Sequence, residues 1–319
     1  MLARRRLIRP VSPGFTLVEL MVVVVIISIL VALTIPLIGD IVTQSRRSAT
    51  KTTITKLHEI MQKRLDAFER GLPEYFQSVI GREYEPANRD HVMIRKRLFQ
   101  ALFWNNAANE ASLGSNSGAS EAKSAAVLYL LVTKMEFFGT AAEDAGQFNS
   151  SEIGEVTING TTHKVFVDSW GNPIVYYPYA TRLIKPDGNT IDRATARYLY
   201  RSLPSKPTDP TKPDPLNDDQ DDPYDVLTPN YTAQAPQPAL NAPLQFTEVN
   251  FHTFRTYHTP LILSAGPDGS FVPTTGVVSG LGLQQRSTAM IGHLAVPDTS
   301  KTEELYDNIS NHNIKAGDK

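Results

Sequence analysis

The chain has 319 residues, of which 41% are hydrophobic and 20% charged, enough for one or two domains with a core of their own. The net charge of −2 gives no global basis for nucleic-acid binding, although four arginines and no acid stand in residues 1–14. Cysteine is absent, which excludes disulfides, thiolate metal sites and cysteine nucleophiles.

The first strong pattern is an apolar run at residues 15–39, which read FTLVELMVVVVIISILVALTIPLIG with Glu19 as the one charge. As a helix this run is roughly 37 Å long, enough to cross a hydrocarbon core of about 30 Å. A buried core helix is disfavoured, because soluble helices rarely stay apolar on every face for this length. A secretory signal peptide fits the basic start, but the run is too long and no A-x-A-like site follows it. The run predicts a transmembrane helix.

Glu19 is the unusual residue of this run. A carboxylate at mid-membrane costs about 2.5–3.5 kcal/mol on insertion scales, and residues 15–39 contain no Lys, Arg or His to pair with it. We expect its partner to come from another chain or to be created by processing. The alternative is an unpaired carboxylate that extends toward the cytoplasmic headgroups.

The segment PGFTLVEL at 13–20, with basic residues before it and the apolar run after it, closely resembles the class III signal of type IV prepilins and type II secretion pseudopilins. The resemblance covers roughly residues 1–70. It implies that a prepilin peptidase cuts between Gly14 and Phe15, removing the leader 1–14, and N-methylates Phe15. Glu19 matches the family's acidic residue, and Pro36 matches a proline that bends its long first helix.

Processing of this kind would give Glu19 a partner. Cleavage creates an α-ammonium at Phe15, and Glu19 of one subunit can neutralise the Phe15 ammonium of its neighbour, which favours one axial stagger in a filament. The implied partners are prepilin peptidase, other copies of the chain, other pilin-like subunits and an inner-membrane assembly platform; no nucleic acid is expected.

Orientation in the membrane is ambiguous from charge alone, because basic residues stand on both sides of the run. Before it lie Arg4, Arg5, Arg6 and Arg9, and after it Arg46, Arg47, Lys51 and Lys56. The resemblance decides for a cytoplasmic leader, a single pass through the bacterial inner membrane and a body in the periplasm or outside.

Residues 40–72 continue the helix as an amphipathic extension, which we expect to end at Gly71 and Pro73. Apolar residues recur at spacings of three and four and predict one buried stripe: Ile54, Leu57, Met61, Leu65, Phe68 and Leu72. The charged residues between them are assigned to the other faces: Lys56, Glu59, Lys63, Arg64, Asp66 and Glu69.

Residues 73–150 are predicted to be a helical insertion with helices at 88–106 and 120–138. The first has Ile94, Leu98, Ala101 and Leu102 on one face, with Phe99 and Phe103 beside it. The second contains AAVLYLLV, which is too short to span a membrane and predicts a core helix. GSNSGAS at 114–120 is typical of a flexible connector.

From 151 to 319 the pattern predicts an antiparallel β head, which makes the fold class α+β and pilin-like. Asn159-Gly160 between two runs of β-branched residues indicates a hairpin. Further strands are expected at 173–179, 249–257, 260–266 and 289–296. Residues 204–243 contain ten prolines and seven aspartates and predict a disordered surface insertion.

Two segments of the head resemble major type II secretion pseudopilins: DSWGNPIVYY at 168–177 and LILSAGPDGSF at 261–271. In the first, Trp170 is expected to anchor a turn whose backbone Gly171, Asn172 and Pro173 shape after Asp168. The second opens a calcium-binding loop in that family. Asp268 is the one acid that matches it, and no later carboxylate completes the site. Two interpretations of Asp268 therefore stay open: it binds calcium, or it caps its own turn. No other cofactor is expected.

The sequence carries no nucleotide loop, zincin motif or nucleophile elbow, so we do not expect an enzyme. The favoured function is a pseudopilin that is processed and polymerises for protein export. A type IV pilin or minor pilin of a surface fibre, for adhesion, motility or DNA uptake, is the alternative. A membrane-anchored binding domain that never polymerises is the second alternative.

Overall fold

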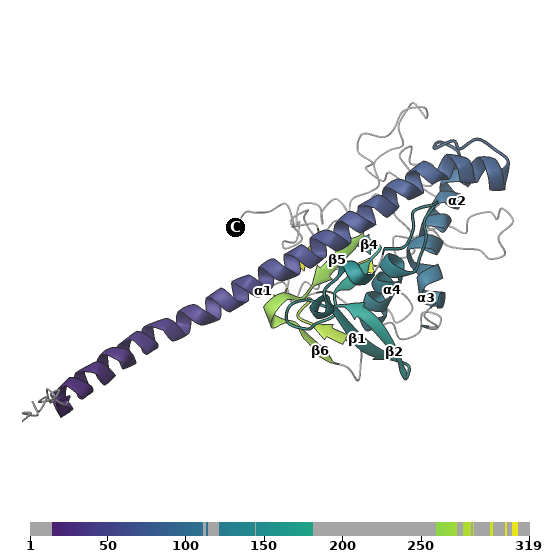
Figure 1. The fold of residues 1–319 in the computed structure, drawn as a ribbon. Helices are drawn as coiled ribbons and strands as arrows, with labels where there is room; N and C mark the ends of the chain where they lie inside the picture. Colours follow the sequence, from purple (N-terminus) through teal and green to yellow (C-terminus); the bar gives the residue numbers. More distant parts are fainter. Residues whose placement is uncertain are drawn as a thin grey trace, which may run out of the picture. The chain divides into compact units, whose positions relative to one another are not determined.

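The computed structural model describes residues 15–110, 113, 121–143, 145–180, 260–272, 277–281, 283, 294–295, 304 and 308–311. The chain divides into two compact units, Met1–Ser45 and Arg46–Lys319. Helix α1 (Leu17–Tyr75), the long helix coloured purple to blue in Figure 1, provides the helix of the first unit and the first helix of the second. The leader 1–14 and the Pro- and Asp-rich segment 204–243 lie outside the described residues.

In the first unit, the described large apolar side chains of α1 are exposed. From Phe15 to Val31 the large apolar side chains are between 47% and 83% exposed. Within the described residues, no helix is both long enough and apolar enough to cross a membrane. The side chains of residues 33–38, which belong to the predicted span 15–39, lie outside the described set, and that span stays a prediction.

The second unit buries the predicted stripe of α1. Ile54, Leu57 and Phe68 are wholly inaccessible to solvent, and Met61 and Leu72 are nearly so, while Leu65 is partly buried against the same cluster. Arg64 contradicts its assignment to the polar faces. Its side chain is buried because the guanidinium donates to the carbonyls of Val132 at 2.9 Å and Met135 at 2.7 Å.

The predicted end of α1 at Gly71 and Pro73 is wrong. The helix continues to Tyr75, passes into a π-helical turn at Phe76–Ile80, and ends at Gly81, whose φ of +73° is left-handed. Such a conformation suits glycine because it lacks a Cβ. Gly71 serves packing instead, since a Cβ built there would lie 2.2 Å from the Phe138 ring.

Three further α-helices follow, and two of them continue from one another through a π turn. The elements are α2 (Arg89–Gln100), the π turn η2 (Ala101–Asn105), α3 (Asn106–Glu110) and α4 (Glu121–Thr133). Asn88 caps α2 by accepting from the amides of Asp90 and His91. Helix α4 is buried along nearly its whole length, which confirms the predicted core helix, although it ends before residue 138.

The predicted apolar face of α2 and η2 is only partly buried. Ile94, Leu98, Ala101 and Leu102 are of intermediate exposure, and three of them pack against the edge of the main core. Charged residues of the same helix are buried more deeply, namely Arg95, Lys96 and Arg97. Phe99 and Phe103, predicted beside this face, are buried in the core, so the apolar side is confirmed there, whereas the burial of the three cations was not predicted.

The β head consists of several small sheets. The strands are β1 (Ile153–Ile158), β2 (Thr161–Phe166), β3 (Val175–Tyr177), β4 (Tyr179–Ala180), β5 (Leu261–Ser264), β6 (Ser270–Val272), β7 (Val277–Ser279), β8 (Leu294–Ala295) and β9 (Ile309–Ser310). Short 3-10 turns lie at Ala145–Gln147, Ser150–Glu152 and Gly266–Asp268. Among the described strands the pairing is antiparallel in β1–β2, β3–β5–β9 and β6–β7, and parallel in β4–β8.

The predicted hairpin is confirmed. Asn159 and Gly160 both have positive φ, +51° and +80°, which suits a tight turn whose twist matches that of the flanking strands. The predicted strands at 173–179 and 260–266 are found in shortened form. The predicted strand 249–257 lies outside the described residues, as does 289–296 except for positions 294–295.

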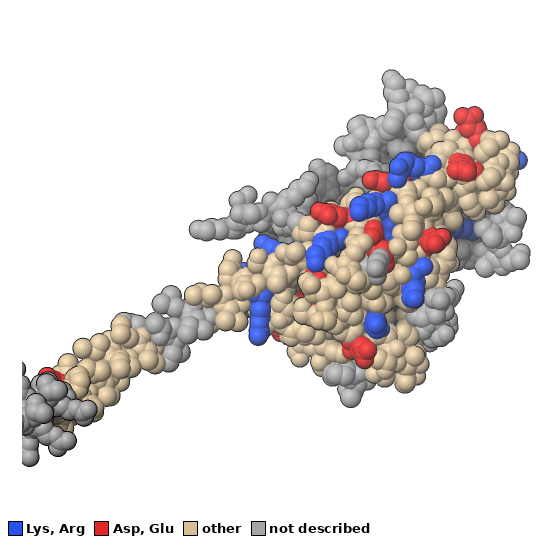
Figure 2. Space-filling view, in the orientation of Figure 1, with Lys and Arg blue, Asp and Glu red and all other residues tan. Residues whose placement is uncertain are grey.

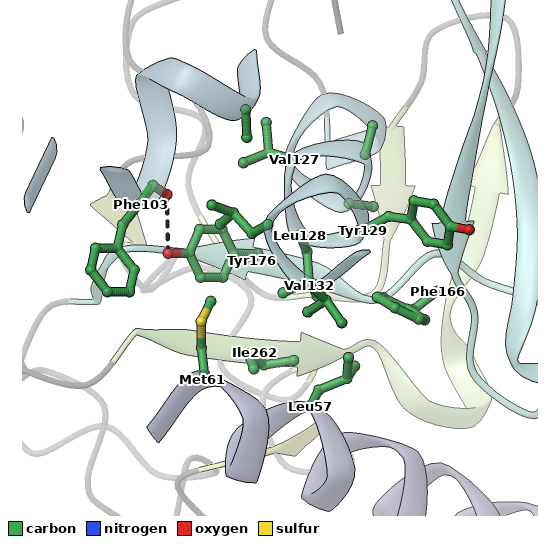
Figure 3. Packing of buried hydrophobic residues seen from close by; sticks show 14 of the residues in the cluster. Leu57, Met61, Phe103, Val127, Leu128, Tyr129, Val132, Phe166, Tyr176 and Ile262 are labelled. Atoms are coloured by element: carbon green, nitrogen blue, oxygen red, sulfur yellow. Dashed lines mark hydrogen bonds between the residues drawn. The ribbon is translucent and has the colours of Figure 1, made fainter. Parts of the chain in front are cut away.

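The core joins α1, α4 and the β3–β5 strands. In Figure 3, Leu57 and Met61 of α1 face Ile262 of β5, and Tyr176 of β3 lies between Phe103 and Leu128. The Tyr176 hydroxyl donates to the Phe103 carbonyl at 3.2 Å. The Ser124 hydroxyl of α4 accepts from the Tyr176 amide at 2.9 Å and donates to its carbonyl, so a helix side chain satisfies the outer edge of β3.

Candidate assembly site at the amino terminus and its support in the head

Helix α1 begins with a reciprocal cap made by Thr16 and Glu19. One oxygen of the Glu19 carboxylate accepts from the Thr16 amide at 2.8 Å and from the Thr16 hydroxyl at 2.9 Å. The Glu19 amide donates to the Thr16 hydroxyl at 3.3 Å. This is a capping box, in which both residues satisfy amides that the first helical turn leaves without partners.

The cap adds hydrogen-bond partners to the charge partner expected for Glu19. The carboxylate takes hydrogen bonds from its own first turn. The T-x-x-E spacing of Thr16 and Glu19 is a recognised signal for such a cap and could have identified it. The hydrogen bonds leave the negative charge uncompensated, and its neutralisation by a neighbouring Phe15 ammonium stays a prediction.

The helix that follows this cap offers a continuous apolar surface. Phe15 is the first described residue and is 83% exposed. Fully burying one Val, Leu or Ile side chain is worth about 1.5–3 kcal/mol, so the surface between residues 17 and 31 favours burial in lipid or against similar helices. Glu19 is the one titratable residue on this surface.

The buried carboxylate of Asp168 organises the turn at residues 168–172, in the first of the two head segments. One of its oxygens accepts from the amides of Trp170 and Asn172, both at 2.9 Å, and the other accepts from the Ser264 hydroxyl at 2.7 Å. Burial raises the pKa of Asp168, although these hydrogen bonds oppose the shift. Gly171 adopts a φ of +89° within the turn, and Trp170 packs partly buried against the main core.

The two head segments that the sequence analysis singled out lie against each other. Besides the contact between Ser264 and Asp168, the Asn172 side-chain amide donates to the carbonyl of Gly269 at 3.1 Å. Gly269 must be small here, because an added Cβ would lie 2.6 Å from the Ala265 side chain. Ser264 belongs to the second segment, but its contact with Asp168 was not predicted, and no spacing in the sequence indicates that contact.

Polar contacts fasten these turns and β1 to α1. The Ser169 amide donates to the Thr50 hydroxyl at 3.1 Å. Glu152 accepts from the Thr53 hydroxyl at 2.6 Å and pairs with the Lys56 ammonium at 3.0 Å. Burial acts to raise the pKa of Glu152, but hydrogen bonds from Thr53, the Asn149 amide and Lys56 bring the pKa below its ordinary value.

Comparison with known families matches the amino-terminal region. Residues 12–35 match the family described as the prokaryotic N-terminal methylation motif. The chain carries the prepilin-type signal of type IV pilins and pseudopilins. No curated protein and no solved structure matches the chain.

The prepilin-type signal includes the predicted processing residues, which the structure describes in part. Gly14 lies outside the described residues, and Phe15 is described. The backbone is helical through Pro36, but its side chain is not among those described, and the predicted bend stays a prediction. Thr16 and Glu19, which form the capping box, both lie after the predicted cut, so cleavage there would remove neither residue.

Asp268, the residue considered for calcium, lies exposed at the end of the turn Gly266–Asp268. A Cβ added to Gly280, whose φ is +81°, would approach its carboxylate to 2.9 Å. No group of three His, Cys, Asp or Glu residues placed to hold a metal ion is found within the described residues. Calcium binding at Asp268 stays a prediction from the resemblance.

Proposed function

We propose that the chain is a pseudopilin-like structural subunit. Prepilin peptidase cuts it between Gly14 and Phe15 and methylates Phe15, and the processed subunit polymerises into a type II secretion pseudopilus for protein export. Before assembly the subunit is held in the bacterial inner membrane by residues 15–39. The observation that carries the proposal is a prepilin-type signal on a helix whose apolar side chains are exposed from Phe15 to Val31.

Burial of this helix in lipid and then in a filament uses the same surface. In either place an isolated carboxylate is costly, and the Thr16 hydrogen bonds lower the cost without removing the charge. The α-ammonium of a neighbouring processed subunit would complete the compensation, with Glu19 as the acceptor. Pairing of this kind favours one stagger between adjacent helices.

Secretion is favoured over a surface fibre by the head. The segments 168–177 and 261–271 resemble those of major pseudopilins, and their side chains meet through Asp168 and Ser264. A type IV pilin or minor pilin is the second candidate, because the prepilin-type signal is common to both classes. Cargo export that depends on the chain, without surface fibres, would support the first candidate, and surface fibres without export would support the second.

The processing step is tested by mass spectrometry of the amino terminus after co-expression with a prepilin peptidase. We expect a chain that begins with N-methylated Phe15. Gly14→Leu should leave the precursor uncut, because the peptidase requires a small residue before the cut in the family that the signal resembles. An intact arginine-rich leader on the wild-type chain would refute the proposal.

Polymerisation is tested by Glu19→Val, which should keep membrane insertion and lose assembly. Since the chain has no cysteine, one cysteine introduced at Val22 reports contacts between copies by cross-linking. Glu59→Gln, an exposed acid on the same helix, is the control and should assemble normally. Wild-type cross-linking of Glu19→Val would contradict the pairing, and no cross-linking of the processed wild type would favour an anchored domain that does not polymerise.

A further inference from the structure

The stretch of α1 that follows the apolar run is basic and lacks acids. Between residues 41 and 58 it contains Arg46, Arg47, Lys51 and Lys56 and no Asp or Glu. Three of these, Arg46, Arg47 and Lys51, form a group that we name the basic collar. Arg46 is exposed, and the other two are partly exposed.

The basic collar differs from the next cations of the helix in its partners. Lys56 pairs with Glu152 at 3.0 Å, and Lys63 lies 4.0 Å from Glu143. None of the ion pairs formed among the described residues includes a member of the collar. On the face of the second unit that Figure 2 shows, positive and negative side chains lie interspersed. The collar is therefore a local excess of positive charge.

Chain connectivity alone keeps the collar close to the proposed span. Arg46 stands seven residues after Gly39, the last residue of the apolar run. Seven residues reach about 25 Å when fully extended and about 10 Å as a helix. Exposed polar side chains surround the collar in sequence, including Gln44, Ser45 and Ser48, and hydroxyl and amide groups suit contact with phosphate oxygens.

We propose that the basic collar binds the headgroups of anionic phospholipids on the side of the membrane where the head lies, and so holds the head of an unpolymerised subunit at the surface. This inference rests on the proposed function, because it requires residues 15–39 to lie in the bilayer. Each Lys or Arg near an anionic surface favours the bound state roughly fivefold. The three together are expected to shift the balance between a docked and a lifted head by roughly a hundredfold.

Trp170 offers a reporter of docking. The amide of its neighbour Ser169 donates to Thr50 at 3.1 Å, and Thr50 lies one helical turn after Arg46 and Arg47 on α1. Trp170 is partly exposed, whereas Trp104, the other of the two tryptophans, is 4% exposed. Trp104→Phe leaves Trp170 as the sole tryptophan, and its quenching by lipids spin-labelled at the headgroup measures contact with the surface.

The experiment uses the full chain in vesicles of phosphatidylcholine alone or with about a third phosphatidylglycerol, an anionic lipid. We expect stronger quenching of Trp170 in the anionic vesicles and its loss in about 1 M salt, which screens charge beyond about 3 Å. The combined Arg46→Gln, Arg47→Gln and Lys51→Gln variant should lose the dependence on anionic lipid. Arg46→Lys with Arg47→Lys should keep it, because the charge is retained.

A matched control removes the same charge elsewhere. Arg70, Arg82 and Lys164 are exposed cations that do not belong to the collar, and their combined change to Gln should leave the quenching intact. Two results would overturn the proposed role of the collar if the chain still floats with the vesicles. One is quenching of Trp170 that does not depend on anionic lipid, and the other is an equal loss of quenching in the control variant. A chain that fails to float with vesicles in high salt would overturn the membrane anchor and the collar together.

Discussion

The two halves of α1 belong to one helix and differ in what covers their apolar side chains. Between residues 17 and 31 these side chains are about half exposed or more, while Ile54, Leu57 and Phe68 of the second half are wholly buried. The second half is held by the core of the head and by polar contacts such as Thr53 with Glu152. The comparison teaches that apolar content alone does not tell which stretch of a helix a subunit uses to fold.

The second half should therefore contribute to the stability of the subunit, and the first half should be free for lipid or other copies. Burying apolar surface is the main favourable term in folding, and the large apolar side chains between residues 17 and 31 stay about half exposed or more. Matched pairs of variants, with one change in each half, can measure this difference in stability. Equal effects of the two changes would contradict it.

The largest difference is expected between Leu57→Ala and Ile27→Ala. Leu57 is 0% exposed and Ile27 is 53% exposed. Removing a buried leucine side chain costs about 3 kcal/mol through lost transfer free energy and a cavity, whereas a surface change stays within about 0.5 kcal/mol. Urea unfolding of the detergent-solubilised chain, followed by circular dichroism, measures both. Equal midpoints for the two variants would contradict the division.

Arg64→Lys tests how the second half is bound to α4. The guanidinium of Arg64 serves two carbonyls at once and lies 4.8 Å from the centre of the Phe137 ring. Lysine cannot match this planar fork, and a buried carbonyl left without a donor costs about 2 kcal/mol. The same unfolding assay should show that loss, with the exposed Arg70→Lys as control. An Arg64→Lys variant as stable as the wild type would show that the two carbonyls do not require the planar guanidinium.

Two glycines allow the halves to be compared at the backbone. A Cβ at Gly71 would lie 2.2 Å from the Phe138 ring, whereas one at Gly39 would meet nothing within 4 Å. Gly71→Ala should destabilise the chain by about 1.5 kcal/mol through overpacking. Gly39→Ala should stabilise the helix of the free subunit by about 0.5–1 kcal/mol. Thermal melts of the two variants in detergent should show opposite shifts of the melting temperature. Shifts of the same sign would be inconsistent with the packing at Phe138.

The smallest expected effect is Glu152→Gln, and its size should depend on pH. Because the folded-state pKa of Glu152 is lowered from 4.5, its charged form stabilises the fold above pH 4.5, and this contribution is lost as the pH falls through the lowered pKa. The variant should cost about 1 kcal/mol at neutral pH, since Lys56 is 35% exposed and partly screened. Unfolding at pH 7 and pH 3 should show the gap closing; a constant gap would exclude the ion pair as its source.

The features that could be predicted from the sequence are those that depend on short, local patterns of residues. The prepilin-type signal, the Asn159-Gly160 hairpin and the core helix α4 each depend on a few adjacent residues, and each was found. The T-x-x-E cap at Thr16 was equally local and was missed, because Glu19 was considered as a charge and not as a hydrogen-bond acceptor.

The errors share a different cause, which is contact between residues distant in the sequence. Gly71 was taken as a helix end, but Phe138 explains its small size. Arg64 was placed on a polar face, but carbonyls at the end of α4 draw it inward. The contact of Ser264 with Asp168 joins positions 96 residues apart, a separation that no periodicity can signal.

The hydroxyl of Ser124 has a consequence for how copies of the head can meet. It occupies both the amide and the carbonyl of Tyr176 on the outer side of β3, where an open strand would otherwise be a template for a strand of another molecule. That side of the three-stranded sheet cannot grow by accepting a foreign strand. Heads brought together at high local concentration are thereby protected there from fusing sheet to sheet, and contacts between neighbours are left to side-chain surfaces.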